Sequence, residues 1–547
     1  MADYLVDKNR GSDSNNGISA PKQSISFLAS TTLNSGDNVL FAADSVFTDA
    51  PTGIGTVAGT KAAPVTFGRY FPTGVNTGRP TFSYLRSMAA GDWTWDAVFN
   101  GWYFSPGYSP GVSSYIKLGG QHWGYFHFGV SALDGDDYEW ALSGAGAGTK
   151  LYLWAPESTN PTDYYGSVDF APSARGQLIF SSDGAYVVIE GLHVEGGSAL
   201  TLIYSSSGTR EYVVRDITAY NCAGILSVNT DTGGALSLTV DRCEGHLSPG
   251  AMIFAFPTSG VGIAKFHATN NVFSGAGHAW TQGAIYTKVR NADQLIAWND
   301  ISDCPHGAGY GVYDGCGIYA ETGSGQVRVI GNILSRMHLG AIDNSGRNAV
   351  WSGNVFVDVK SALKLDDEAS VGSTDHKFLC NTIIRSGSAE YPSLGIEESG
   401  NGWRAVKNLN ALVANNLFVA ASGASSLYAI TTPTSGTGSI ANNLAYGFAG
   451  LAINSSGGAA SPTPTGTGTS NPLLDDSYRP RAGSPCLEAG TRIADVVLKD
   501  FYGKDITKTP DIGAVQVYPA RAASAARGVI TRSASTRTAS GRRAAYG

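Results

Sequence analysis

A short pattern of apolar and polar positions recurs through the middle of the chain. It reads apolar, any residue, turn-former, apolar, any residue, apolar, and its first and last copies are VIEGLHV and IANNLAY. Each copy predicts a short strand, a corner and a second short strand, because apolar and other residues alternate on both sides of the turn-former. Successive copies are 22 to 35 residues apart. We therefore expect a stack of similar units.

Aligning the copies places one turn-forming residue of each at an equivalent corner. These residues are Gly191, Asp216, Arg242, Asn271, Asn299, Asn332, Asn354, Asn381, Asn416 and Asn443. Asn tolerates the left-handed backbone conformation and hydrogen-bonds to nearby backbone, so it suits a corner between strands. In stacked units, equivalent Asn side chains can also bond to one another as a ladder.

The length of the unit fits one coil of a β-helix. Three strands of about 3–6 residues and three turns need a period in the twenties, and longer intervals leave room for loops. A propeller needs a period of about 40–50 residues. A leucine-rich solenoid needs spaced Leu residues and helical stretches, which the sequence lacks. We predict an all-β chain that folds as a parallel β-helix of about ten or more coils.

Both ends of the chain carry further motifs. They are GSDSNNGIS (Gly11–Ser19), LNSGDNVLF (Leu33–Phe41), YRPRAGSPCLEAG (Tyr478–Gly490), DFYGK (Asp500–Lys504) and DIGAVQ (Asp511–Gln516). Together with the Asn pattern, they resemble the pectate-lyase-like right-handed parallel β-helix superfamily over about residues 3–516. The resemblance implies a right-handed coil. It does not imply one chemistry, since the superfamily holds lyases, hydrolases, epimerases and non-catalytic adhesins.

Composition divides the chain into five segments. We expect an N-terminal cap with the first coils in 1–65, an aromatic-rich β insertion in 66–180, regular coils in 181–455, a linker and closing segment in 456–516, and a basic Ala/Ser/Arg tail in 517–547. Most aromatic rings of the insertion are expected to form its core, while exposed ones can stack on sugar rings. The tail is expected to aid solubility or docking, although its arginines could also contact nucleic acid.

Charge and cysteine content exclude several classes. A net charge of −7 argues against a dedicated nucleic-acid binder. The chain has no apolar run of 18 residues, so no membrane span is expected, and the start MADYLVDKNRG lacks the apolar core of a Sec signal peptide. The six cysteines form no CxxC pair. We expect them to be small buried apolar side chains, with a Cys304–Cys316 disulfide as the alternative and no zinc site.

Charged and aromatic residues gather on a second set of strands, which includes GAIYTK, CGIYAET, GAIDNS, SALKLDD and LGIEES. The expected inward residues are Ile285, Ile318, Ile342, Leu363 and Ile396. Alternation then predicts two outward columns. The first is Tyr286, Tyr319, Asp343, Lys364 and Glu397, and the second is Lys288, Glu321, Ser345, Asp366 and Ser399.

Three of these carboxylates, Glu321, Asp343 and Asp366, are the predicted catalytic residues. Coils stack about 4.7–4.9 Å apart. Carboxylates one coil apart therefore approach the separation in retaining glycosidases, about 5 Å, and those two coils apart approach the inverting separation, about 6.5–9.5 Å. Close like charges also raise the pKa of one carboxyl, as a general acid requires. The preferred pair is Glu321 and Asp366, with Asp343 between them. The alternative is a solvated polar flank, which every β-helix has.

Neighbouring residues are predicted to bind substrate. They are Tyr319, Lys364, Glu397, Asp314 and Tyr286. Asp314 ends the loop HGAGYGVYD, which could wall a groove, and it is a secondary candidate acid. No metal site and no cofactor are expected for a hydrolase. Under a lyase alternative, Lys364 would be the base, and Asp343 and Asp366 would hold Ca²⁺.

The lack of a Sec signal, the Gly content and a β-helix with an aromatic region together resemble bacteriophage tailspikes. The resemblance implies a homotrimer in a virion tail, or outside the cell, that binds and hydrolyses bacterial surface polysaccharide. A terminal segment would attach it to the tail or baseplate. Two alternatives stay open. One is a polysaccharide lyase, although the pectate-lyase calcium and arginine pattern and the polygalacturonase motifs are not evident. The other is a non-catalytic receptor-binding or structural virion protein, which needs no carboxylate pair.

Overall fold

A computed structural model of the chain describes most of residues 1–517. The described residues are 1–48, 52–105, 115–119, 122–123, 125–127, 139–143, 149–171, 178–180, 185–196, 200–205, 210–220, 222, 224–230, 236–248, 250–255, 263–276, 283–287, 293–304, 316–320, 327–343, 348–365, 375–386, 394–396, 410–420, 428–432, 437–454, 463–493 and 498–517. The chain separates into two compact units, Met1–Gln516 and Val517–Gly547. The predicted basic tail lies almost entirely outside the described residues.

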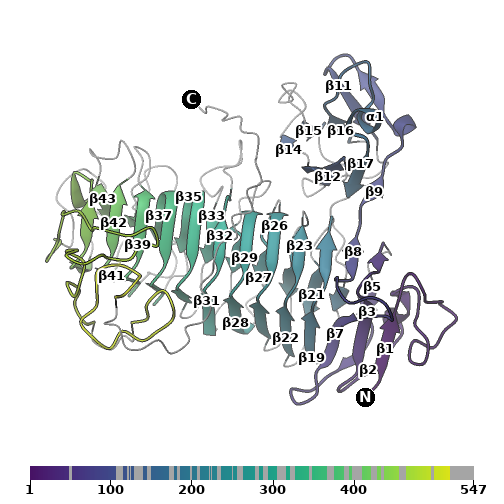
Figure 1. The fold of residues 1–547 in the computed structure, drawn as a ribbon, viewed down its shortest axis with the longest axis horizontal. Coiled ribbons are helices and arrows are strands. Elements are labelled where there is room, and N and C mark those ends of the chain that lie inside the picture. Colours follow the sequence, from purple (N-terminus) through teal and green to yellow (C-terminus); the bar gives the residue numbers. More distant parts are fainter. Residues whose placement is uncertain are drawn as a thin grey trace. The chain divides into compact units, whose positions relative to one another are not determined.

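Three rows of parallel strands build the first unit (Figure 1). Row 1 is a 13-stranded sheet. Its strands are β1 (Asp3–Val6), β3 (Asn38–Ala42), β7 (Val65–Tyr70), β19 (Ala185–Glu190), β22 (Arg210–Arg215), β25 (Leu236–Asp241), β28 (Ile263–Thr269), β31 (Asp293–Ala297), β34 (Val327–Ile330), β36 (Val350–Ser352), β38 (Lys377–Leu379), β41 (Asn410–Ala414) and β44 (Thr437–Ala441).

Rows 2 and 3 follow row 1 in each coil. Row 2 contains β4 (Val46–Phe47), β8 (Thr81–Ser83), β20 (His193–Glu195), β23 (Thr218–Tyr220), β26 (Glu244–Ser248), β29 (Val272–Ala276), β32 (Asp300–Ser302), β39 (Thr382–Ser386), β42 (Leu417–Ala420) and β45 (Leu444–Tyr446). Row 3 contains β5 (Thr52–Ile54), β18 (Leu178–Phe180), β21 (Thr201–Ser205), β24 (Leu226–Thr230), β27 (Ile253–Ala255), β30 (Ile285–Thr287), β33 (Cys316–Ala320), β40 (Leu394–Ile396), β43 (Tyr428–Thr432) and β46 (Gly450–Asn454). The long strands β35 (Ile333–Asp343) and β37 (Val355–Leu365) run through both rows.

Each strand pairs in parallel with its counterpart in the next coil. In row 1, β22 pairs with β25 and β25 with β28, and in row 2, β23 pairs with β26. Parallel pairing between strands one coil apart is the defining arrangement of a β-helix. The predicted fold class is therefore confirmed. Inward residues of all three rows, such as Val240, Phe273 and Ile318, are fully buried and belong to one continuous core.

The predicted Asn ladder is present at the corner between rows 1 and 2. Each Nδ2 donates to Oδ1 of the Asn in the next coil, for example Asn271 to Asn299 at 2.8 Å. The same pairing joins Asn299, Asn332, Asn354, Asn381, Asn416 and Asn443 in sequence. These side chains are buried. Each ladder step therefore satisfies polar atoms that would otherwise be costly to bury.

The alignment of the first three copies was wrong by one residue. Thr218, Glu244 and Val272 are in register, so Ile217 and Cys243, not Asp216 and Arg242, precede them at the position equivalent to Asn271. Likewise Leu192, not Gly191, takes this position, since His193 pairs with Thr218. The left-handed residue is the one before the ladder position: φ is 54° at Asp216, 51° at Arg242 and 56° at Asn270. The copies were matched on turn-forming chemistry, and that chemistry occurs at two adjacent corner positions.

Two small sheets lie between β8 and β18 in the chain. One has the order β10-β11-β16-β15-β14 and the other β13-β12-β17-β9. Their strands are β9 (Arg86–Ser87), β10 (Thr94–Asp96), β11 (Gly101–Phe104), β12 (Tyr115–Leu118), β13 (His122–Trp123), β14 (Tyr125–His127), β15 (Glu139–Leu142), β16 (Leu151–Leu153) and β17 (Val168–Ala171). The helix α1 (Pro161–Tyr165) is capped by the side chain of Asn160. Buried rings of Trp93, Phe104, Trp140 and Phe170 form a core separate from that of the coils.

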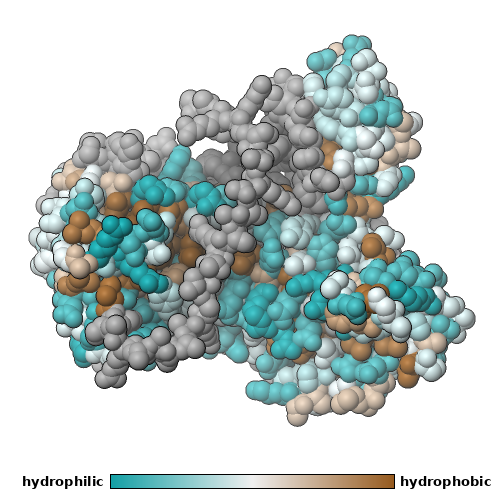
Figure 2. Space-filling model, viewed as in Figure 1, coloured by the Kyte–Doolittle hydropathy of each residue, from teal (hydrophilic) through white to brown (hydrophobic). Residues whose placement is uncertain are grey.

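The remaining short elements are β2 (Leu33–Asn34), which pairs with β6 (Val57–Ala58), and the 3₁₀ helices η1 (Ser26–Ala29) and η2 (Ala90–Asp92). No helix of the described residues is long and apolar enough to cross a membrane. Figure 2 shows polar residues and small groups of apolar ones intermixed on the face in view. Scattered apolar residues of this kind are normal on a protein surface.

The closing segment, residues 463–493 and 498–516, packs against row 2 of the last coils. Leu474, Tyr478, Phe501 and Ala514 of this segment contact a cluster of apolar residues of row 2. Those row-2 residues are Val355, Val357, Ile384 and Val419. The backbone N–H of Ala514 also donates to Oγ1 of Thr382 at 2.8 Å. The C-terminal motifs therefore cover an apolar part of the coil face that would otherwise be exposed.

The six cysteines are free and buried. This confirms the prediction that they act as small apolar side chains, and it excludes the alternative disulfide between Cys304 and Cys316. Burial raises the pKa of the Cys222, Cys243 and Cys304 thiols to about 12.

Candidate functional site

Most of the predicted carboxylates lie outside the described residues. These are Glu321 and Asp366 of the preferred catalytic pair, together with Asp314 and Glu397. For Asp343 the structure gives the backbone, at the end of β35. The catalytic pair therefore stays a prediction.

The register of row 3 differs from the predicted one. Ile318 lies opposite Ala341, and Tyr319 lies opposite Ile342. Ala341, fully buried in the core, is therefore the inward residue of β35 where Ile342 had been expected. In β40 the offset is two residues, since Leu394 rather than Ile396 lies opposite Leu363, and both residues remain on the same face of the strand.

The one-residue shift in β35 breaks the predicted outward column at Asp343. Asp343 is in register with Ala320 and Leu365, one position away from the column of Tyr319 and Lys364. A one-residue slip exchanges the two faces of a strand. GAIDNS offers two adjacent apolar residues, Ala341 and Ile342, and the larger one is the expected inward residue, so the sequence alone predicts the wrong face here.

In the predicted row-3 column, the three residues whose side chains the structure describes are buried. Tyr286 and Tyr319 are 6% and 8% exposed, and Lys364 is 7% exposed. The Tyr286 ring stacks on Phe254 at 5.2 Å between centroids and meets Tyr319 edge-on at 5.0 Å. These rings fill a cluster of their own outside the main core. In this structure they stabilise the packing of neighbouring coils and offer little surface to a ligand.

A more accessible set of chemical groups lies on row 2. The first column of outward residues is His193, Thr218 and Glu244, in register on β20, β23 and β26. The second is Glu195, Tyr220, His246 and Ser274, which continues to β29. We call His193, Glu195, Tyr220, Glu244 and His246 the ring ladder, because its three rings come from three successive coils.

Two of the three rings of the ladder stack, and the third is tilted against them. The centroids of His193 and Tyr220 are 5.3 Å apart, and those of Tyr220 and His246 are 5.0 Å apart with an angle of 23° between the planes. Tyr220 and His246 occupy equivalent positions of coils about 4.8 Å apart, which brings their rings into stacking contact. His193 lies opposite Thr218, and its ring meets Tyr220 at a tilt of 53°.

Glu244 links two of the rings. Its Oε1 accepts a hydrogen bond from the Tyr220 hydroxyl at 3.4 Å and lies 2.8 Å from Nε2 of His246. The Glu244 side chain is 48% exposed and that of His246 is 25% exposed. Carboxylate, imidazole and phenol therefore meet at one accessible place, where they can donate and accept hydrogen bonds or move a proton.

The other end of the ladder is more enclosed. Nδ1 of His193 lies 2.7 Å from the Thr218 hydroxyl, and burial lowers the pKa of His193, against a smaller opposing effect of Glu195. Nζ of Lys117, in β12 of the small sheets, lies 3.1 Å from Glu195. His193 is therefore held neutral near pH 7, and the charge of Glu195 is balanced.

Sequence reasoning missed the ring ladder, although a signal was present. The interval is 25 residues from Glu195 to Tyr220 and 26 from Tyr220 to His246, the same intervals as between the repeat copies there. The repeat pattern defines the inward apolar positions of each coil, whereas the ring ladder lies at outward positions that this pattern leaves undetermined.

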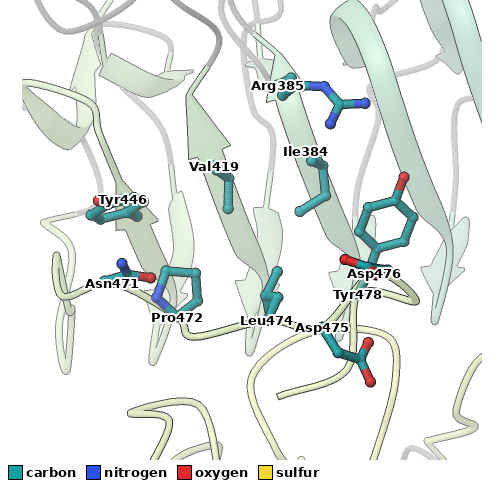
Figure 3. A pocket seen from close by; sticks show the side chains of 10 residues that line it. All are labelled: Ile384, Arg385, Val419, Tyr446, Asn471, Pro472, Leu474, Asp475, Asp476 and Tyr478. Atoms are coloured by element: carbon teal, nitrogen blue, oxygen red, sulfur yellow. The ribbon is translucent and has the colours of Figure 1, made fainter. Parts of the chain in front are cut away.

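Along row 2 the second outward column changes from polar to apolar residues. After Ser274 it continues through Ser302 and Ser335, and then becomes apolar at Val357, Ile384 and Val419. The closing segment covers the apolar part. A hollow of about 380 Å³ remains between that segment and the strands β39, β42 and β45 (Figure 3).

Among the described residues, no group of three or more His, Cys, Asp or Glu side chains is placed to hold a metal ion. The chemistry of the described site therefore consists of carboxylate, imidazole, phenol and hydroxyl groups.

No family model and no curated protein sequence matches the chain. Several solved structures resemble it. The complex of XylC with xylose aligns over 94% of this chain and 98% of that chain, with a TM-score of 0.52 and 11% identity. The lacto-N-biosidase of family GH136 from Eubacterium ramulus aligns over 86% and 67%, with a TM-score of 0.43 and 11% identity. Pectate lyase Pel9A aligns over 94% and 96%, with a TM-score of 0.35 and 13% identity. The chain thus shares its fold with the XylC structure over nearly the whole length of both.

Proposed function

We propose that this protein binds and degrades a polysaccharide. The observation that carries the proposal is the ring ladder, in which Glu244, Tyr220 and His246 present hydrogen-bonding groups on consecutive coils of a regular face. A sugar chain is itself a regular series of hydroxyl-bearing rings. A face that repeats its polar groups coil after coil can bind several such rings in succession. The shared fold with XylC, whose structure holds xylose, supports this choice of ligand.

We propose hydrolysis as the reaction, with Glu321 and Asp366 as the catalytic carboxylates. Glycoside hydrolysis needs one carboxylic acid to protonate the leaving oxygen and one carboxylate to act as base or nucleophile. Both residues follow row-3 strands, Glu321 after β33 and Asp366 after β37. The strands β33, β35 and β37 pair in succession, so two coil steps separate the positions at which these two strands end. Two steps of about 4.8 Å correspond to the inverting separation rather than to the retaining one.

We further propose a biological setting that resembles a bacteriophage tailspike. In this setting the polymer is a bacterial surface polysaccharide, the protein is a homotrimer of a virion tail, and a terminal segment attaches it there. The β-helix with its additional small sheets supports this proposal.

The test measures the release of reducing ends from a panel of bacterial surface polysaccharides. Glu321→Gln and Asp366→Asn are expected to lower the cleavage rate by about 10²–10⁴-fold, because each removes a proton-transfer group. Glu244→Gln is expected to weaken binding of the polymer. Glu211→Gln, on the row-1 face, is the matched control and is expected to leave the cleavage rate and the binding of the polymer unchanged.

Each outcome separates the alternatives. Products with the ultraviolet absorbance of unsaturated uronates would identify a lyase and direct attention to Lys364. Binding that depends on Glu244, without cleavage of any polymer, would favour a receptor-binding protein. If Glu321→Gln and Asp366→Asn both cleave the polymer at the wild-type rate, the proposed catalytic pair is wrong.

A further inference from the structure

The hollow beneath the closing segment has an apolar floor. Ile384 and Val419 lie in register on consecutive coils of row 2, and Leu474 of the closing segment faces the same space (Figure 3). Ile384 is 5% exposed. The volume, about 380 Å³, is near the lower end of the range of ligand pockets, about 300–1,000 Å³.

Two tyrosines stand at opposite ends of this floor (Figure 3). Tyr446 follows Val419 in register on the next coil and is 37% exposed. Tyr478 belongs to the closing segment and takes a left-handed backbone conformation, with φ of 62°. An aromatic ring beside an apolar floor matches the C–H face of a sugar ring, and the phenol hydroxyl can bond to a sugar hydroxyl.

The charges around the hollow favour an uncharged ligand. Nε and Nη2 of Arg385 bind the two carboxylate oxygens of Asp358 at 2.5 and 2.6 Å, so the guanidinium charge is already balanced. Asp475 and Asp476 also line the hollow. Oδ1 of Asp475 accepts hydrogen bonds from the backbone N–H groups of Ser477 and Arg479, and the exposed Asp476 adds a further carboxylate. An anionic group would be repelled, whereas sugar hydroxyls could donate hydrogen bonds to these oxygens.

We propose that this hollow is a second saccharide-binding site, which takes an uncharged segment of the polymer, one or two sugar rings long. This proposal rests on the proposed function only because it treats the bound saccharide as part of the polymer that the protein degrades. The site acts by retaining the polymer. Its selectivity implies a polymer with neutral or N-acetylated sugars in the segment that binds here, rather than consecutive uronic acids.

The experiment compares Tyr446→Ala with Leu473→Ala, both made together with Glu321→Gln so that no ligand is cleaved. Leu473 is 43% exposed and does not line the hollow, so it is the matched control. Affinities are measured by calorimetry and saturation-transfer NMR with neutral oligosaccharides, N-acetylhexosamine oligosaccharides and uronic-acid oligosaccharides of equal length. Neutral or N-acetylated ligands are expected to bind, about tenfold more weakly to Tyr446→Ala, because a lost aromatic contact and its buried area are of that order.

A second variant tests the charge argument. Asp476→Asn is expected to raise the affinity for uronic-acid oligosaccharides at least severalfold and to leave the affinity for neutral ones within about twofold. Equal affinity of Tyr446→Ala and Leu473→Ala would overturn the proposal, as would the absence of binding by all the oligosaccharides. Cleavage of polymer by the wild type, together with unchanged binding by Tyr446→Ala, would refute this site alone. Binding that depends on Tyr446 without cleavage would refute the hydrolase and leave this site standing.

Discussion

Oδ1 of Asn354 accepts two hydrogen bonds from Asn332 of the preceding coil, one from Nδ2 at 2.9 Å and one from the backbone N–H at 3.0 Å. Nδ2 of Asn354 donates in turn to Oδ1 of Asn381 and to the carbonyl of Val329. The side chain is fully buried. Asn354 therefore accepts the hydrogen bonds of the Asn in the preceding coil, while its own Nδ2 and backbone N–H donate to the Asn in the next coil.

Asn354→Ala should destabilise the protein strongly. It removes the acceptor of two buried donors of Asn332, and each unsatisfied donor costs about 1–3 kcal/mol, so a loss of about 2–6 kcal/mol is expected. The measurement is the thermal unfolding midpoint at a fixed scan rate, since a long solenoid need not unfold reversibly. Asn34→Ala is the control, because Asn34 is exposed. Equal midpoints for the two variants would contradict the stabilising role of the ladder.

Gly331→Ala should loosen the closing segment. Gly331 has φ of +65°, and an added Cβ would lie 2.8 Å from both the carbonyl oxygen of Phe501 and the indole of Trp298. Strain of this kind costs about 1–3 kcal/mol. We expect faster proteolysis within residues 463–493, measured by mass spectrometry of the cleaved fragments. Gly250→Ala is the control, since a Cβ there meets nothing within 4 Å. Identical cleavage patterns would show that this contact does not hold the segment.

His193 should make stability depend on pH. Burial lowers the pKa of His193 in the folded state, so below the ordinary value of about 6.5 the unfolded state binds the proton more readily. The stability that neutral His193 contributes is thus fully present above about pH 6.5. It is lost as the pH falls towards the pKa of His193 in the folded state. We expect His193→Gln to reduce the drop in unfolding midpoint between pH 7.5 and 5.

His267, whose pKa burial also lowers, contributes in the same direction and remains in the His193→Gln variant. The drop should therefore become smaller without disappearing. A drop as large as in the wild type would show that His193 takes up its proton equally well in the folded and unfolded states.

The cysteines should resist alkylation in the folded protein. Burial raises the pKa of the Cys222, Cys243, Cys304 and Cys380 thiols to about 12, and thiolate is the reactive form. Treatment with iodoacetamide at pH 8 is expected to leave these four unmodified, whereas denaturant should make all six cysteines of the chain react. Peptide mass spectrometry reads each site separately. Rapid modification of Cys243 in the native protein would show that the Asn corner opens on the time scale of the reaction.

The coil architecture could be predicted from the sequence, because the same apolar spacing recurs at intervals that fit one β-helix turn. The Asn ladder followed from that repeat, since identical residues at equivalent positions of stacked coils must meet. Burial of the cysteines followed from the absence of paired spacings, since a free Cys usually behaves as a small buried apolar side chain.

Where two apolar residues are adjacent in a strand, the sequence could not predict which of them faces inward. GAIDNS is compatible with either Ala341 or Ile342 inside, and only pairing with Ile318 selects Ala341. Asp216 and Arg242 were likewise placed at the ladder position because both adjacent corner residues accept turn-forming chemistry. Alternation gives the period of a strand, whereas its register depends on the strand next to it.

The sequence by itself determined the repeating coil, its corners and its apolar interior, because those depend on composition at regular intervals. Only the tertiary structure brought Tyr220, Glu244 and His246 into one hydrogen-bonded group, and only it placed the closing segment beside Tyr446 to form the hollow. Both sites join residues more than twenty positions apart through the exact pairing of coils or the docking of a terminal segment. Such contacts depend on register and packing, which an apolar pattern leaves undetermined.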